Sequence, residues 1–357
     1  MNREEKLLNL ISQFKELGID KQIDYDKFYL YSLITHSTAI EGSTITEIEN
    51  QLLFDEGISA KGRTMTEQLM NLDLKAAYEQ CIIYAKNHED VSIDMLKKLS
   101  SIVMKNTGTS FSTALGDFSS SNGDLRLLNV MAGVGGRSYM NYSKVPIKLE
   151  ELCKSINHRR KELSKLSIFE AYRLSFDAHF QLVTIHPWAD GNGRMSRLLM
   201  NQLQFEFNII PSNINKDSKA EYIETLIATR ERGDMDLFYN FMFDEHIKNL
   251  EQMIHNYQTS LESDNVYYTN KVKESDGLND GLNDGLNDGL NDGLKLSERS
   301  KTIISIIKDK PSITVDEIAK ALNLSKPTTE RELALLKSQN IIQRQGSKKT
   351  GTWKINL

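Results

Sequence analysis

A dense group of reactive side chains lies in the stretch HPWADGNGRMSR, residues 186–197. It begins with His186, whose imidazole can act as a general base near neutral pH. Four residues later Asp190 supplies a hard carboxylate oxygen, the kind of ligand that holds Mg²⁺ on phosphate oxygens. One short stretch therefore combines a candidate base with a candidate metal ligand.

The same stretch is suited to bind phosphates. Pro187 should end one helix, and a second helix should begin near Gly193. Gly191 and Gly193 permit backbone conformations that aim successive N–H groups into one concavity, and a helix N-terminus adds partial positive charge there. Arg194 and Arg197 stand three residues apart on the new helix, so both can reach a polyphosphate. Each feature alone has a structural explanation, but together they predict a site that binds a magnesium nucleotide and deprotonates its attacker.

The elements that must position this stretch are predicted to be helices. Apolar residues recur at three- and four-residue spacing over most of residues 1–260. The segment SIFEAYRLSFDAHFQLVTI, residues 167–185, is apolar on nearly every side, which indicates a buried central helix that ends at Ile185. Residues 116–146 are rich in Gly and Ser and predict a loop with a short β-hairpin that turns at Gly135–Gly136.

The C-terminal part is a separate unit. Residues 275–294 repeat Gly-Leu-Asn-Asp with a four-residue period, a pattern that predicts a linker. After it, three helical segments and two short strands predict a winged helix-turn-helix, and Thr314 with Glu317 forms the capping box of its second helix. The predicted domains are a helical region (1–95), a catalytic core (96–260), a linker (261–296) and the winged helix (297–357).

Composition and charge limit the possible partners. The chain carries a formal net charge of −5, yet from Lys295 to the end 13 Lys or Arg stand against 6 Asp or Glu. A basic tail on an acidic body predicts different partners for the two parts. No apolar run approaches the roughly 20 residues needed to cross a bilayer, and the first residues do not resemble a signal peptide. We expect a cytoplasmic protein without a membrane partner, in which Cys81 and Cys153 are reduced core thiols.

Residues 186–197 resemble the signature of Fic-domain proteins, HPFx[D/E]GNGRxxR, with Trp188 in place of the usual phenylalanine. The resemblance extends over roughly residues 30–250. It implies a mainly α, helical Fic fold with a short β-hairpin flap. It also implies transfer of AMP from ATP to a Ser, Thr or Tyr hydroxyl of a target protein, with Mg²⁺ as cofactor. The resemblance also implies a role for each of these motif residues. His186 would be the base and Asp190 the Mg²⁺ ligand. Gly191, Asn192 and Gly193 would surround the α- and β-phosphates, and Arg194 and Arg197 would bind the β- and γ-phosphates.

A second motif lies far upstream. STAIEG, residues 37–42, is similar to the inhibitory pattern [S/T]xxxE[G/N] of the family, through Ser37, Glu41 and Gly42. The resemblance implies that Glu41 reaches the nucleotide site and pairs with Arg197. A carboxylate there would occupy the cation that should hold the γ-phosphate and would repel the charge of the nucleotide. We therefore expect an enzyme that is inhibited by its own N-terminal helix.

The predicted hairpin resembles the flap with which Fic proteins hold a target segment by strand addition. Arg126, Asn129, Val130 and Gly133 fit the flap pattern, although SSSNGD interrupts its usual start. The resemblance implies that four flap residues lie beside the nucleotide: Val130, Met131, Ala132 and Gly133. It places Tyr222 and residues 230–234 at the adenine pocket. The expected partner is a target protein, including the chain itself.

Two other functions remain open. The same core could remove AMP from a modified protein, with Glu41 positioning a water molecule. Alternatively, it could only sense nucleotide for a DNA-binding regulator. The winged helix suits contacts to DNA through Lys326, Thr328, Thr329 and Arg331 in its recognition helix and Lys348 and Lys349 in its wing. It could equally dock or dimerise with protein.

Overall fold

A computed structural model describes residues 2–131, 138–161, 166–275, 298–322, 329, 332–333, 336–337, 341–345 and 351–355. The chain divides into two compact units, Met1–Gly277 and Leu278–Leu357. The first unit contains every residue of the predicted nucleotide site that the structure describes.

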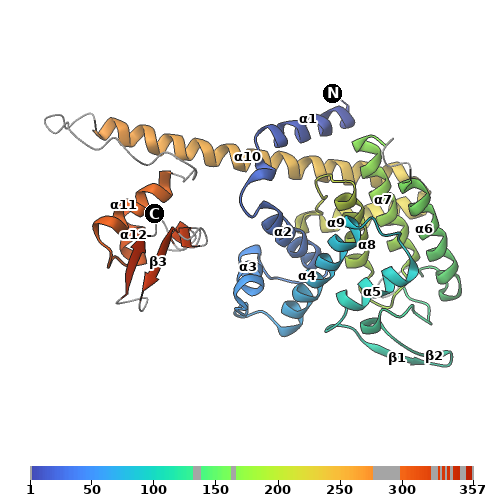
Figure 1. The fold of residues 1–357 in the computed structure, drawn as a ribbon. Coiled ribbons are helices and arrows are strands. Elements are labelled where there is room, and N and C mark those ends of the chain that lie inside the picture. Colours follow the sequence, from blue (N-terminus) through green and yellow to red (C-terminus); the bar gives the residue numbers. More distant parts are fainter. Residues whose placement is uncertain are drawn as a thin grey trace. The chain divides into compact units, whose positions relative to one another are not determined.

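The first unit is built of helices (Figure 1). Its α-helices within the described ranges are α1 (Arg3–Glu16), α2 (Tyr25–Ile40), α3 (Glu47–Glu56), α4 (Met65–Lys86), α5 (Ile93–Val103), α6 (Val145–Arg160), α7 (Ile168–Ile185), α8 (Asn192–Glu206), α9 (Lys219–Arg232) and α10 (Met235–Ser275). Short 3₁₀ turns lie between them: η1 (Ile19–Lys21), η2 (Ser120–Asn122), η3 (Tyr142–Lys144) and η5 (Lys216–Ser218).

Helix α7 is the centre of this unit. It contributes to a core cluster shared with α4, α5, α6 and α8, and to a second cluster shared with α1, α9 and α10. Burial on both sides explains why its sequence is apolar on nearly every face, as predicted. A capping box at Ser167 and Glu170 starts the helix, and it ends at Ile185, directly before residues 186–197.

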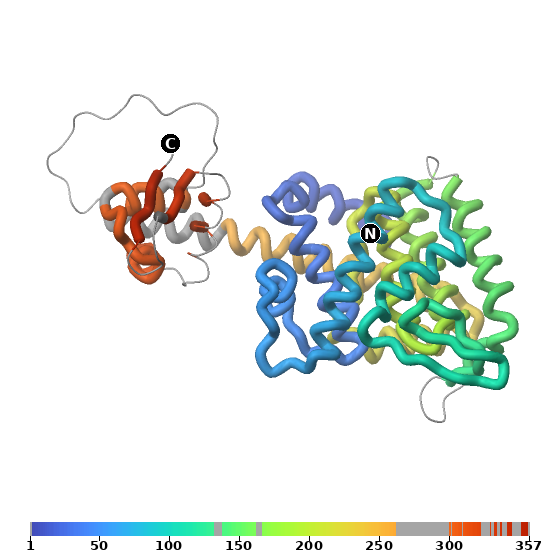
Figure 2. Tube along the Cα trace, turned by 60° about the horizontal axis from the view of Figure 1, so that its bottom comes forward, coloured from blue at the N-terminus to red at the C-terminus, as the bar shows by residue number. Residues whose placement is uncertain are grey.

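A regular hairpin stands at the edge of the first unit, where Figures 1 and 2 show it projecting from the helices. It pairs β1 (Ser110–Thr113) with β2 (Gly116–Ser119) antiparallel, and Phe111 lies opposite Phe118. The sequence did not predict this hairpin, because its strands span only four residues each. The predicted flap is present further along as a bridge between Met131 and Ser138. Its predicted turn at Gly135–Gly136 lies outside the described residues.

The last helix of the unit, α10, is longer than the sequence suggested. The predicted linker begins at residue 261, but the helix runs to Ser275. The segment YQTSLESDNVYYTNKVKES contains neither glycine nor proline, so no local signal ends the helix before the repeat begins. The repeat itself lies almost entirely outside the described residues.

The second unit has the elements of a winged helix: α11 (Glu298–Asp309), α12 (Val315–Ala321) and a hairpin of β3 (Ile342–Gln345) with β4 (Thr352–Ile355). The predicted capping box at Thr314 is confirmed. Thr329 is fully buried, so it packs into the core of this unit instead of facing DNA. The other predicted DNA-contacting residues lie outside the described ranges: Lys326, Thr328, Arg331, Lys348 and Lys349.

Two expectations from composition can be compared with the fold. Cys81 and Cys153 are both buried free thiols, and burial raises the pKa of each. Over the part of the chain that the structure describes, no helix combines the length and apolarity needed to span a membrane.

Candidate active site

His186 caps the C-terminus of α7 in a left-handed conformation, with φ 54° and ψ 62°. Its amide still donates to the Leu182 carbonyl at 3.0 Å, so the backbone leaves the helix only at this residue. A left-handed conformation is costly for a residue with a Cβ. Pro187 follows and cannot extend the helix, which accounts for the abrupt exit. The imidazole is thereby held at a rigid helix end.

The hydrogen bonding of His186 assigns its two ring nitrogens. Nδ1 lies 3.3 Å from the Val183 carbonyl oxygen, which can only accept. In the neutral ring Nδ1 therefore carries the proton, and Nε2 is the free base. The pKa of His186 is lowered to about 4, mainly by burial and further by the charges of Arg126 and Arg230. The hydrogen bond to Val183 acts in the opposite direction. The imidazole is neutral near pH 7, as a base must be.

The predicted phosphate loop, residues 190–193, uses its two glycines in different ways. Gly191 is the N-cap of α8 with φ 82°, a conformation that favours glycine. Helix α8 starts at Asn192, and the amides of its first turn have no intrahelical acceptor. The Asn192 side chain is turned away from them, because it donates to the Trp188 carbonyl at 2.9 Å and accepts from the Trp188 amide at 3.1 Å. Asn192 can therefore offer a phosphate its backbone amide, while its side chain holds the loop.

Gly193 is already helical and does not have a positive φ. Its lack of a side chain makes room instead. A Cβ at this position would lie 2.5 Å from Oε1 of Glu41 and 3.1 Å from Nη1 of Arg197. The second glycine thus allows the Glu41 carboxylate to approach the start of α8.

Glu41 and Arg197 form the pair that the two sequence motifs predict. Nη2 of Arg197 donates to Oε1 of Glu41 at 2.7 Å. The same guanidinium donates to Ser37, through Nε to Oγ at 2.8 Å and through Nη2 to the carbonyl at 2.9 Å. Gly42, with φ 105°, ends α2 directly after Glu41 and so fixes the carboxylate at the helix end. Ser37 and Glu41 therefore both bind one arginine, and Gly42 ends the helix that carries them.

The charges of this pair support one another. Burial by itself would raise the pKa of Glu41, but the charge and hydrogen bond of Arg197 outweigh it, so the pKa lies below its ordinary value. Burial would likewise lower the pKa of Arg197, but Glu41 raises it. Arg197 is 3% exposed and 32% of the Glu41 side chain remains exposed. Both groups are charged near pH 7, and solvent reaches the pair from the glutamate side.

The two arginines of α8 have different hydrogen-bond partners in this structure. Arg194 is turned toward the end of α5, where Nη2 lies 3.0 Å from the Met104 sulfur. It is 3% exposed, and its Nε is buried without a hydrogen-bond partner among the described residues. Nη2 also lies 3.9 Å from Asp190, whose side chain is 65% exposed. Arg194 therefore carries an unused buried donor beside an exposed carboxylate at the mouth of the loop.

Tyr222 lies behind Arg197. The residue is 3% exposed, and its hydroxyl lies 2.8 Å from Nε2 of His179. The hydroxyl also lies close enough to Arg197 to raise the pKa of that guanidinium. Tyr222 thus stands beside Arg197 and His179, and its place at the adenine pocket stays a prediction.

Arg126 links the flap to the catalytic stretch. Its Nε donates to the His186 carbonyl at 2.7 Å, and its other nitrogens donate to the carbonyls of Leu128 and Met140. The guanidinium is 1% exposed and therefore joins both ends of the flap to the end of α7. Of the predicted flap residues, Met131 is exposed, and Val130 accepts from the Tyr139 amide at 3.0 Å. Ala132 and Gly133 lie outside the described residues.

Two contacts at this site had no signal in the sequence. The Tyr139 ring stacks on the His186 imidazole with centroids 3.7 Å apart, and His179 supports Tyr222. A tyrosine in a loop and a histidine within an apolar helix carry no motif. Their partners are distant in the chain, so only the folded structure identifies them.

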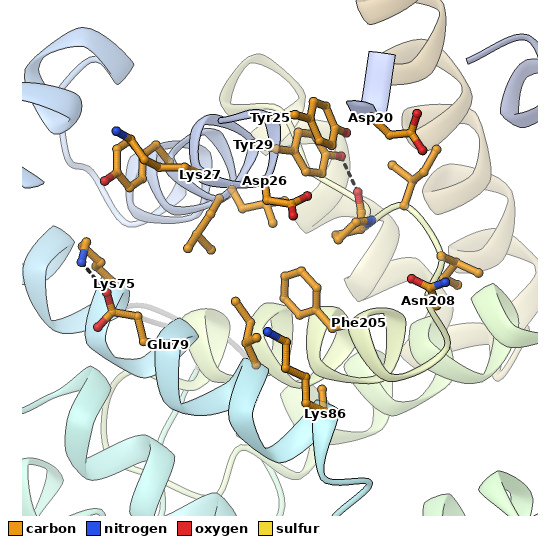
Figure 3. Close-up of a pocket in the computed structure, with 18 of the residues that line it drawn as sticks. Asp20, Tyr25, Asp26, Lys27, Tyr29, Lys75, Glu79, Lys86, Phe205 and Asn208 are labelled. Carbon is orange, nitrogen blue, oxygen red and sulfur yellow. Dashed lines mark hydrogen bonds and ion pairs between the residues drawn. The ribbon is translucent and has the colours of Figure 1, made fainter. Parts of the chain in front are cut away.

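A large cavity lies away from this site. Figure 3 shows it between α2, α4 and the end of α8. Its volume is about 620 Å³. Its lining includes Tyr25, Tyr29, Phe205 and Lys86, and it includes none of the residues predicted for the nucleotide site. The cavity is therefore separate from the predicted chemistry.

Comparison with known proteins identifies the class to which this fold and site belong. Residues 90–204 match the Fic/DOC family, and residues 296–343 match a family described as winged helix-turn-helix DNA-binding. The chain therefore contains a Fic domain followed by a C-terminal winged helix-turn-helix. The predicted fold class, mainly helical with a small antiparallel hairpin, is confirmed.

Individual relatives are similar at modest identity. A protein named protein adenylyltransferase fic-1 from Caenorhabditis elegans is 25% identical over 244 residues, which are 68% of this chain and 44% of that protein. Protein adenylyltransferase Fic from Aedes aegypti is 28% identical over 59% of this chain and 39% of that protein. The chain thus spans less than half the length of these curated relatives.

Among solved structures, a Fic domain containing signaling protein from Bacteroides thetaiotaomicron has a TM-score of 0.59 at 20% identity. The match covers 71% of this chain and 97% of that one. This similarity shows the fold.

Proposed function

We propose that the chain transfers AMP from ATP to a hydroxyl side chain of a target protein and that Glu41 keeps this activity low. The observation that carries the proposal is the contact of Ser37 and Glu41 with Arg197, eleven residues after the free base of His186. Relatives that carry the name protein adenylyltransferase support the same reaction class.

In the proposed reaction, Nε2 of His186 removes the proton from a Ser, Thr or Tyr hydroxyl of the target. The oxygen then attacks the α-phosphorus of ATP, the bond from that phosphorus to the β-phosphate oxygen breaks, and pyrophosphate leaves. The amides at the start of α8 can stabilise charge that develops on the phosphates. Arg197 would hold the γ-phosphate once its guanidinium is released.

Magnesium fits this site through Asp190. The described residues contain no cluster of three or more His, Cys, Asp or Glu side chains. Mg²⁺ on a nucleotide does not need such a cluster, because it commonly takes one or two carboxylates together with phosphate oxygens and water. Asp190 is exposed at the mouth of the loop, where its Oδ1 accepts from the Gly191 amide at 2.6 Å, and its other carboxylate oxygen can serve as the ligand. When bound, the ion would neutralise phosphate charge.

The proposed inhibition follows from competition for one guanidinium. The γ-phosphate and Glu41 need the same face of Arg197, and the carboxylate also repels the phosphates. Because Gly193 lets Oε1 of Glu41 approach the first turn of α8, the carboxylate stands next to the phosphate-binding amides. ATP could still bind, but with its α-phosphate misaligned for attack.

Labelled AMP transfer tests the reaction. The purified chain, as wild type and as Glu41→Gly, is incubated with labelled ATP, Mg²⁺ and a cell lysate, and the products are identified by mass spectrometry. We expect labelled protein with the Glu41→Gly chain and little with wild type. Absence of transfer from both would contradict the proposal. Incubation with an AMPylated protein tests the reverse reaction, in which Glu41 would position water and the Glu41→Gly chain would release no AMP.

We further propose that the C-terminal unit binds DNA, because its match is to a family described as DNA-binding. Basic residues dominate from Lys295 onward, which suits phosphate contacts. Binding of a random DNA duplex, measured by fluorescence anisotropy at several salt concentrations, tests this. We expect affinity that falls steeply with salt, whereas no binding at low salt would favour protein docking.

A further inference from the structure

The flap carries a side chain that covers the proposed catalytic base. The Tyr139 ring lies over the His186 imidazole with centroids 3.7 Å apart and an angle of 15° between the rings. Such a stack covers one face of the imidazole and leaves the ring edges open. Since Nδ1 is directed at the Val183 carbonyl, the open edge is the one that carries Nε2.

A cation also lies close to the Tyr139 ring. The guanidinium of Arg230, on α9, lies 5.1 Å from the centre of the ring, within the range of a cation–π contact. Tyr139 therefore contacts both the imidazole at the end of α7 and a guanidinium on α9.

The backbone of Tyr139 belongs to the closing side of the flap. Its amide donates to the Val130 carbonyl at 3.0 Å, next to the bridge between Met131 and Ser138. The following residue, Met140, accepts a hydrogen bond from Arg126, which also binds the carbonyl of His186. The flap thus reaches His186 in two ways, through Arg126 at its backbone and through Tyr139 at its ring.

We propose that Tyr139 is a positioning residue through which the flap holds the His186 imidazole with Nε2 facing the substrate. The idea rests on the proposed function, in which His186 is the base. Tyr139 itself takes no proton and contacts no phosphate in this arrangement. It restricts the rotation of the imidazole, which within the described ranges is otherwise held by the hydrogen bond of its Nδ1 to Val183.

The stack also explains part of the electrostatics of the base. Tyr139 excludes water from one imidazole face, and burial is the main reason that the pKa of His186 is lowered to about 4. Three charged groups act on His186 from the elements around it. Arg126 and Arg230 lower its pKa, and Glu41 raises it. Loss of the Tyr139 ring should admit water and let the pKa rise toward the ordinary value of about 6.5.

The test compares Tyr139→Ala with Tyr139→Phe, which keeps the ring. Tyr142→Ala is the matched control, because Tyr142 stands three residues further along the same segment and no ring contact joins it to His186. The first measurement is an NMR titration of the imidazole signals of the full chain. The chain has seven histidines, and a His186→Gln variant assigns the signal. We expect the pKa of His186 to rise in Tyr139→Ala only.

The second measurement is AMP transfer as a function of pH, with every variant also carrying Glu41→Gly. A misplaced catalytic group commonly costs up to about 100-fold in rate. We expect Tyr139→Ala to lose about 10- to 100-fold and its acid limb to move to higher pH, whereas Tyr139→Phe and Tyr142→Ala should keep the parent profile. Unchanged rate and pH profile in Tyr139→Ala, or a gain in rate, would overturn the positioning role.

The two measurements separate the proposals. A rise in the His186 pKa without AMP transfer from any variant, including the parent, would support the contact and reject the proposed function. Transfer from the parent with an unaltered His186 titration in Tyr139→Ala would support the function and reject the role of Tyr139.

Discussion

Replacement of Glu41 by glycine should activate AMP transfer, because it frees the guanidinium of Arg197. A hydrogen bond between charged groups contributes about 1.5–3 kcal/mol. Arg197 is 3% exposed, but a third of the Glu41 side chain is in contact with solvent, which screens the pair. We therefore take the lower end of the range, about 1.5 kcal/mol. That free energy corresponds to slightly more than tenfold in productive ATP binding.

The assay measures labelled AMP on the chain itself and on lysate proteins for wild type, Glu41→Gln and Glu41→Gly at equal concentration. Glutamine has nearly the same shape as glutamate, and its amide oxygen can still accept from Arg197, so it should activate less than glycine. Glycine should raise incorporation about tenfold or more. Equal incorporation by all three proteins would refute the competition between Glu41 and the γ-phosphate.

Thermal unfolding provides the control for folding. Removal of Glu41 leaves Arg197 with two hydrogen bonds to Ser37, so the cation keeps hydrogen-bond partners. We expect a stability loss of roughly 1–2 kcal/mol and not collapse of the domain. A protein that is unfolded under assay conditions would make the activity comparison invalid, and Glu41→Gln then serves in its place.

Three further changes test the other assignments. His186→Ala should lower transfer about 10²–10⁴-fold while nucleotide binding, measured by calorimetry, stays within a few-fold, and unchanged turnover would reject His186 as base. Arg197→Ala should be inactive in AMP transfer although it also removes the partner of Glu41, so a variant more active than wild type would limit Arg197 to inhibition. Gly193→Ala should destabilise the wild-type chain more than the Glu41→Gly chain, because its Cβ would lie 2.5 Å from Oε1 of Glu41, and equal losses in thermal unfolding would contradict that contact. The pKa of Glu41 is lower in the folded chain than the value of about 4.3 in the unfolded chain. Its ion pair is therefore fully formed above about pH 4.3 and is lost only as the pH falls through the lower pKa of the folded chain. Inhibition should accordingly persist from pH 8 to 5 in the transfer assay.

Local physics explains what could be predicted well. The end of α7 at Ile185, its burial and the capping box at Thr314 follow from periodicity, proline and side-chain capping within a few residues. The sequence also placed the hairpin of the winged helix. Helix α10 extended past its predicted end because nothing in its sequence stops a helix before the glycine repeat.

The candidate site could be predicted where it forms one continuous stretch, from His186 to Arg197. The same residues did not reveal how their side chains are used. Gly193 makes room for a carboxylate, the Asn192 side chain holds Trp188, and Arg194 turns to Met104. The surroundings of Gly193 and Arg194 depend on which helices pack against α8, and helical spacing alone does not specify that. The contact of Asn192 depends on the conformation of the loop before α8.

The sequence by itself therefore determined the chemical groups of this protein and the helices that carry them. Only the tertiary structure decided which groups meet. Glu41 reaches Arg197 because α2 packs against α8, although 156 positions separate the two residues. Tyr139 reaches His186 because Arg126 joins both ends of the flap to the end of α7. Such contacts join residues far apart in the chain, and they form only when the packing of the apolar core brings their helices together.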